Sequence, residues 1–186
     1  MRLMTAVLLS GLIVPSAYAQ VSSSMAPQKQ FTMPASEQKN IADNPSWTAP
    51  QKPLRVYGNT LSVGPQGLGV FLITARAGDV LIDGGVPGDA TLIEGNIRDL
   101  NINLRDIRWI LISHAHSDHA GSIAQLAHDT GAQVIAGAAD APLLERGGHD
   151  DPEYGERVPV PPVHVTRTVT DHEALHLGDL VLTARV

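Results

Sequence analysis

The sequence predicts an α/β fold in which helices cover layered sheets. Short runs rich in β-branched and aromatic residues come first, and strand-like runs then alternate with helix-like segments. That order is typical of sheets with helices packed on their faces. A chain of 186 residues, 43% hydrophobic and 17% charged, is long enough to bury the core that such a fold needs.

The first 19 residues differ from the rest of the chain. Arg2 precedes an apolar run over residues 3–14, and Ala17-Tyr18-Ala19 has the small-x-small pattern of a cleavage site. This arrangement predicts a secretory signal peptide that is removed before Gln20. The apolar run is shorter than the roughly 20 residues that span a bilayer. We therefore expect a periplasmic or secreted protein with no stable membrane association after cleavage.

Residues 20–45 follow the leader and are rich in Ser, Gln, Pro, Lys and Met, without a sustained hydrophobic period. This composition predicts a flexible N-terminal arm. The folded domain is expected over residues 46–186, starting near Trp47.

Four short runs of β-forming residues open the domain, at 54–57, 60–63, 70–75 and 80–83. Glycine, asparagine and proline separate them, as at Gly58-Asn59. Closely spaced strands with turn residues between them predict an antiparallel meander.

The pattern then changes to alternating helices and strands. Asp89 can cap a helix in which Ile93, Ile97 and Leu100 recur on one face. Residues 107–112 are almost continuously apolar, which predicts a strand buried on both faces. The remaining predicted elements are a helix at 121–129 stopped by Gly131, a strand at 133–136, a helix at 140–146, and strands at 163–169 and 180–184.

Charge and cysteine content restrict the possible functions. A formal net charge of −6 makes the chain a poor candidate for binding nucleic acid phosphates, so we expect no nucleic acid partner. The absence of cysteine excludes disulfides and thiolate metal ligands.

Four metal-ligand side chains lie within six residues, in His114-Ala115-His116-Ser117-Asp118-His119. Histidines two apart can bind one ion, and an adjacent Asp-His pair can reach a second ion close by. The motif follows the predicted buried strand, at the edge where α/β sheets form binding crevices. Nitrogen and carboxylate ligands favour Zn²⁺, with Mn²⁺ or Fe²⁺ as alternatives. Two such ions would activate a bridging water for hydrolysis. The alternative is a polar loop that binds no metal.

The motif resembles the His-x-His-x-Asp-His signature of the metallo-β-lactamase superfamily. Residues 46–50, 67–73, 79–85 and 107–113 are similar to the corresponding stretches of the subclass B3 enzymes. His119 and His114 separate the chain from subclasses B1 and B2, which have Arg and Asn at these two positions.

This resemblance implies a four-layer αββα fold, of which the chain holds roughly the N-terminal half to two-thirds. It also implies two Zn²⁺ ions in the complete protein, with His114 and His116 on one and Asp118 and His119 on the other. Asp118 is in addition the candidate catalytic residue. The implied activity is hydrolysis of the β-lactam ring amide by a zinc-bound hydroxide, with a small-molecule antibiotic as substrate.

Asp83, at the end of a predicted strand, has two interpretations. It can orient the metal loop by hydrogen bonding, or it can be an ordinary strand-end turn residue.

The chain departs from the family pattern in lacking the segments that carry two further zinc-binding histidines. The other histidines have surroundings that favour a surface or structural role: His128, His149, His164, His172 and His176. We therefore expect a domain that is incomplete at its C-terminus, and a polypeptide that is weak or inactive and prone to aggregate.

Three rival functions remain. A periplasmic lactonase is the strongest, because opening a ring ester uses the same zinc chemistry; export and acidity count against a thioesterase or an RNA nuclease. A metal-binding scaffold without activity is the second. A serine β-lactamase is the third, because Ser36 and Lys39 match Ser-x-x-Lys, but no Lys-Thr-Gly partner exists.

Overall fold

The computed structural model of the protein describes residues 31–185. The predicted signal peptide at residues 1–19, and residues 20–30 of the predicted arm, lie outside this range. Within the described residues, no helix has both the length and the apolar character needed to cross a membrane.

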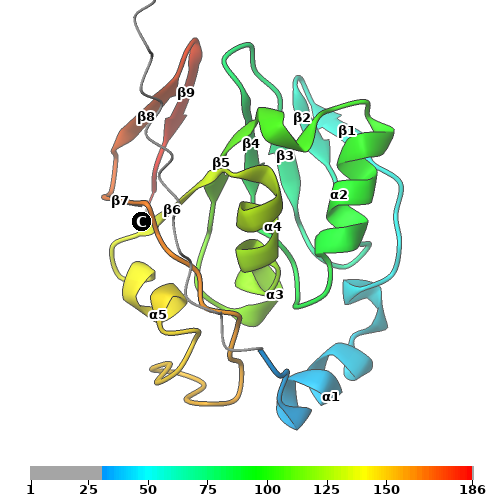
Figure 1. Ribbon diagram of the computed structural model, residues 1–186, viewed down its shortest axis with the longest axis vertical. Helices are drawn as coiled ribbons and strands as arrows, with labels where there is room; N and C mark the ends of the chain where they lie inside the picture. The colour runs from blue at the N-terminus through cyan, green and yellow to red at the C-terminus, as the bar shows by residue number, and fades with distance from the viewer. Residues whose placement is uncertain (1–30, 186) are drawn as a thin grey trace, which may run out of the picture. The chain divides into compact units, whose positions relative to one another are not determined.

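A mixed sheet of seven strands forms the centre of the fold (Figure 1). Its strands lie side by side in chain order: β1 (Leu54–Tyr57), β2 (Thr60–Ser62), β3 (Phe71–Ile73), β4 (Asp79–Ile82), β5 (Ile107–Leu111), β6 (Gln133–Gly137) and β7 (Arg167–Val169). Strands β1 to β4 pair antiparallel, which confirms the predicted meander. Strands β4 to β7 pair parallel, so their carboxyl ends meet at one edge of the sheet.

Helices connect the parallel strands and cover one face of the sheet. They are α2 (Ala90–Asp99), α3 (Ser117–Ala120), α4 (Ile123–Thr130) and α5 (Ala141–Glu145). Figure 1 shows α2 and α4 in front of the sheet. The predicted apolar face of α2 is confirmed, because Ile93 and Ile97 are fully buried. Helix α4 ends at Gly131, which has the left-handed φ of 74° that favours glycine after a helix.

Side chains alternate along the central strands and so divide between two cores. Leu81 on β4 and Ile110 on β5 belong to the core beneath the helices. Their neighbours Val80 and Trp109 point to the opposite face. This is the period of two that strand geometry requires, and it confirms that β5 is buried on both faces.

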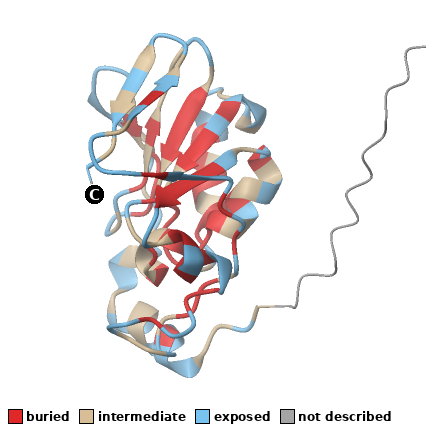
Figure 2. Cartoon of the chain, turned by 90° about the vertical axis from the view of Figure 1, so that its left-hand side faces the viewer, coloured by how far each residue is buried: buried red, intermediate tan, exposed pale blue. Residues whose placement is uncertain are grey.

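The opposite face carries a two-stranded hairpin, β8 (Ala174–Leu177) and β9 (Leu180–Thr183). Leu175 of β8 packs against Val80 and Trp109. Figure 2 shows buried positions concentrated in the central strands and exposed positions along the hairpin. The α/β class is confirmed. Of the four predicted layers, the described residues contain the helix layer, the large sheet and this hairpin.

Two local predictions differ from the structure. Residues 35–43, assigned to the flexible arm, form helix α1 (Ala35–Asp43), followed by a short 3-10 helix at Pro45–Trp47. The hydroxyl of Ser36 donates to the carbonyl of Arg157, and Glu37 is buried. The predicted strand at 163–169 shortens to β7, and β8 was not predicted. Helix α1 depends on contacts distant in sequence, which a local pattern does not contain. Strand β8 pairs with β9 across Gly178-Asp179, a local hairpin signal that the prediction overlooked.

Candidate metal centre

The His-rich loop follows β5 directly and leads into α3 (Figure 1). Its neighbour at the same edge of the sheet is the loop after β4, because β4 and β5 are parallel partners. The two loops are joined by the N–H of Gly84, which donates to the carbonyl of His119 at 2.7 Å. They also pack closely at Gly121, where an added Cβ would lie 2.3 Å from the nitrogen of Pro87.

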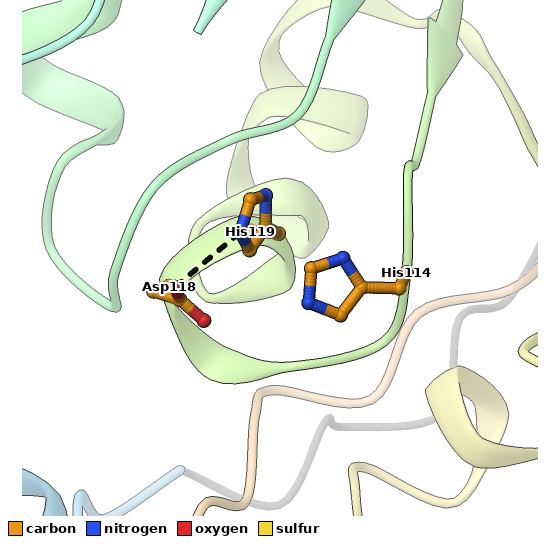
Figure 3. Close-up of side chains that lie close together, drawn as sticks. All are labelled: His114, Asp118 and His119. Carbon is orange, nitrogen blue, oxygen red and sulfur yellow. Dashed lines mark ion pairs between the residues drawn. The ribbon is translucent and has the colours of Figure 1, made fainter. Parts of the chain in front are cut away.

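Three of the four predicted ligands converge: His114, Asp118 and His119. One ligand atom from each lies within 4.8 Å of the others, and all three residues are half-buried. Figure 3 shows the imidazole of His114 reaching from the loop toward the two residues on α3. Asp118 Oδ2 lies 3.3 Å from His119 Nε2, the pair joined by the dashed line.

His116 is close to this group but is not part of it. Its ring centroid is 4.8 Å from that of His114. Its Nε2 faces Asp151 Oδ2 at 3.4 Å, on the side of the loop after α5.

Asp83 connects the two loops through both carboxylate oxygens. Oδ1 accepts the backbone N–H of Ser113 at 2.8 Å, and Oδ2 accepts the hydroxyl of Ser113 at 2.8 Å. Oδ2 also lies 2.9 Å from Nδ1 of His119. The backbone of Asp83 has a φ of 62°, which non-glycine residues seldom adopt. Asp83 thus contacts His119 at one ring nitrogen, while the other ring nitrogen faces Asp118.

The side chains of the site shift one another's pKa values. Hydrogen bonds to Asp118 and then to Asp83 raise the pKa of His119 to about 9. The same bond to His119 holds the pKa of Asp118 below its ordinary value. Burial, and then repulsion from His119 and His116, lower the pKa of His114. At neutral pH these shifts leave Asp118 ionised and His114 neutral, the forms in which both bind metal. His119 carries a proton at that pH, which a bound cation would have to displace.

The donor set fits a zinc ion in its chemistry. It offers imidazole nitrogens and a carboxylate, and zinc accepts both kinds of ligand. The atoms are close enough for one ion to reach several of them. The structure therefore contains a His/Asp cluster suited to metal binding.

Sequence reasoning did not find two further residues of this region. Asp140, just before α5, accepts the backbone N–H of Ala115 at 3.0 Å and so fixes the loop between the first two histidines. Asp151 faces His116. Asp140 could have been found, because it follows β6, whose carboxyl end lies at the same edge as that of β5.

The remaining histidines lie away from the cluster within residues 31–185, and their side chains are exposed. Each of four pairs with an acidic neighbour: His128 with Asp129, His149 with Glu156, His164 with Glu145 and His172 with Asp171. His176 lies on β8 and is also exposed. Ser36 and Lys39 are not joined to each other, since Lys39 pairs with Asp43 and Ser36 bonds the carbonyl of Arg157.

Comparisons with known proteins show which family the chain resembles in sequence and fold. The profile of the Metallo-beta-lactamase superfamily matches residues 69–184. A metallo-beta-lactamase from Novosphingobium pentaromativorans has 48% identity and a TM-score of 0.70, covering 75% of this chain and 52% of that one. A subclass B3 enzyme of Bradyrhizobium japonicum has 39% identity and a TM-score of 0.71, covering 75% and 53%.

The curated relatives carry a more general description. A metal-dependent hydrolase from Rhizobium johnstonii is 34% identical over 89 residues, which is 48% of this chain and 37% of that protein. The chain thus spans about half the length of the similar solved structures and just over a third of this relative.

Proposed function

The chain belongs to the metallo-beta-lactamase superfamily, and we propose from this membership that its protein hydrolyses the amide bond of the β-lactam ring with zinc. The observation that carries the proposal is the convergence of His114, Asp118 and His119 at the edge of the sheet. The subclass B3 enzyme of Bradyrhizobium japonicum supports the choice of substrate. Its identity of 39% extends the likeness beyond the fold.

Two zinc ions are proposed for the complete protein. His114 and His116 would hold one, and Asp118 and His119 would hold the other, each with further ligands. When bound, the metal would supply activation of water and stabilisation of negative charge on the carbonyl oxygen.

The residues of the chain would prepare the site for this chemistry. Asp83 and Ser113 hold the ring of His119 through Nδ1 and so leave Nε2 available. Asp118, whose pKa is lowered by His119, stays ionised at neutral pH and can accept a proton during the reaction. Asp140 fixes the backbone at Ala115 and limits the movement of the loop that carries the first two histidines.

Export to the periplasm or beyond remains part of the proposal, because the leader-like pattern of residues 1–19 suits an enzyme whose substrates act outside the inner membrane. The substrate would be a small molecule. The curated relatives are named only as metal-dependent hydrolases and do not select a substrate. A lactone is the second candidate substrate, since ring ester and ring amide opening share one mechanism.

Nitrocefin hydrolysis tests this function. The protein encoded by the complete open reading frame would be assayed with and without a zinc chelator, and beside the variants Asp118→Asn and Asp129→Asn. Asp129 is the matched control, because it pairs with an exposed histidine on α4.

We expect the wild type to hydrolyse nitrocefin and the chelator to abolish this turnover. The turnover rate should fall at least about 100-fold in Asp118→Asn and should be unchanged in Asp129→Asn. Zinc binding with no nitrocefin turnover but with hydrolysis of a homoserine lactone would replace the β-lactam substrate by the lactone. A protein that binds no zinc would overturn the proposal.

A further inference from the structure

Asp151 lies in the loop after α5 and faces His116, and nothing in the zinc ligand pattern accounts for it. The residue is 6% exposed, which is unusual for a carboxylate in a loop. Oδ2 lies 3.4 Å from Nε2 of His116. If a buried carboxylate accepts the N–H of one ring nitrogen of a neutral histidine, the other ring nitrogen is unprotonated and can bind a metal.

The loop holds the Asp151 side chain in one orientation. Oδ1 accepts the backbone N–H groups of Glu153 at 2.8 Å and Tyr154 at 2.7 Å. The backbone of Asp151 is also paired with that of Gly155 in an isolated bridge. With Oδ1 occupied, Oδ2 is the oxygen that remains for His116.

Tyr154 restrains the same imidazole from a second direction. Its ring meets that of His116 edge-on, with the centroids 4.9 Å apart and the planes at 78°. The guanidinium of Arg157 lies over the ring of Tyr154, 5.5 Å from its centroid, and the carbonyl of Arg157 accepts a hydrogen bond from the hydroxyl of Ser36 on α1. The loop is therefore supported from outside the site.

We propose that Asp151 is a positioning residue that fixes His116 as the Nε2–H tautomer, so that Nδ1 is the nitrogen offered to the metal. Metal-binding histidines usually donate their second ring N–H to a carboxylate or carbonyl, which fixes both the tautomer and the ring orientation. Asp83 acts on His119 in the opposite sense, since it holds Nδ1 and leaves Nε2. The two histidines would thus present different nitrogens. This inference rests on the metal site of the proposed function.

Asp151→Asn separates this role from that of a turn residue. The amide oxygen of the variant can still accept the N–H groups of Glu153 and Tyr154. Its NH₂ group would then face Nε2 of His116 as a donor, which favours the tautomer protonated on Nδ1. Asp150→Asn is the matched control, because it removes the same charge from the adjacent, exposed residue of the same loop.

Two measurements on the 186-residue chain decide the matter. The first is the tautomer of His116 without metal, from long-range ¹H–¹⁵N correlation at a pH where the imidazole is neutral, with His116→Gln for assignment. The second is zinc affinity by competition with a chromophoric chelator. We expect Nε2–H in the wild type and in Asp150→Asn, a shift toward Nδ1–H in Asp151→Asn, and a loss of about 10- to 100-fold in zinc affinity in that variant alone.

A wild-type His116 protonated on Nδ1 would overturn the proposal, as would an Asp151→Asn variant with unchanged tautomer and affinity. If circular dichroism shows that the variant does not fold, the wild-type tautomer still decides. Failure of this proposal can be told apart from failure of the proposed function. A chain that binds zinc but does not hydrolyse β-lactams would overturn only the proposed function, because the His116 tautomer and the zinc affinity can still be measured.

Discussion

The two faces of the seven-stranded sheet are covered in different ways. On one face, α2 and α4 close over a core in which Leu81 and Ile110 are fully buried. On the other face, only the hairpin β8–β9 packs against the sheet within the described residues, and most of its own apolar side chains are partly exposed.

The difference follows from chain connectivity. A parallel pair of strands needs a crossover, and α2 and α4 are the crossovers from β4 to β5 and from β5 to β6. The helix-covered face is therefore built by segments that the sheet itself requires. The hairpin follows β7 and pairs only with itself, β8 with β9. It is not a crossover between strands of the large sheet, so the topology of that sheet does not require it. We expect stability to be concentrated on the helix side, together with the His-rich loop that leads into α3.

Leu81→Ala should produce the largest effect. The side chain is fully buried between the sheet and the helices, so its truncation leaves a cavity and should lower the free energy of unfolding by about 3 kcal/mol. Urea denaturation followed by circular dichroism measures this change. Val181→Ala, at a side chain that is 52% exposed on the hairpin, is the control and should be nearly silent. Equal losses in the two variants would contradict the comparison.

Zinc should stabilise the same side of the molecule. At a free concentration of about 100 times its Kd, a ligand that binds only the folded state adds about 2.7 kcal/mol to the free energy of unfolding. Thermal unfolding with and without zinc tests this, and His119→Ala should abolish the gain. His164→Ala, at an exposed histidine paired with Glu145, should retain it. Stabilisation that persists in His119→Ala would place zinc elsewhere.

Asp89 should make the helix side sensitive to pH. Burial raises the pKa of this carboxyl to about 6, while the N–H of Val86 opposes the shift. A pKa raised in the folded state contributes stability that is complete below the ordinary value of 3.8 and is lost as pH rises through about 6. The free energy of unfolding should therefore fall by up to about 2 kcal/mol between pH 4 and 7 through this group.

Asp89→Asn tests that pH dependence, because the amide can keep the bond to Val86 and has no charge to bury. Its unfolding free energy should decline less than that of the wild type over the same pH range. Parallel pH profiles for the two proteins would show that Asp89 is not the source.

Leu182→Ala should have the smallest effect of the series. The side chain is half-buried in the cluster on the hairpin face, and its truncation should cost about 1 kcal/mol. A loss as large as that of Leu81→Ala would show that the hairpin face is as well packed as the helix face. Hydrogen exchange would give an independent ranking, with β8 and β9 exchanging before β4 and β5.

Much of the fold could be predicted because it depends on local patterns. The spacing of Ile93 and Ile97 predicted α2, the apolar run over residues 107–112 predicted β5, and Gly131 marked the end of α4. Strand β8 was missed although Gly178-Asp179 joins it to β9 as a two-residue hairpin turn, which is a local signal. Helix α1 was missed for a different reason, because its contact with Arg157 lies 121 residues away.

By itself the sequence determined the kinds of candidate metal ligand and their order along the chain. It also placed His114, Asp118 and His119 within six residues, so that the strand and the short helix α3 bring them together through local geometry. Only the tertiary structure decided how the His-rich loop and the rings of His116 and His119 are held. Asp83, Asp140 and Asp151 arrive from three other loops, and the position of each depends on which strands are neighbours at the edge of the sheet. Hydrogen bonds between such loops depend on distance in space, and spacing along the sequence does not encode that distance.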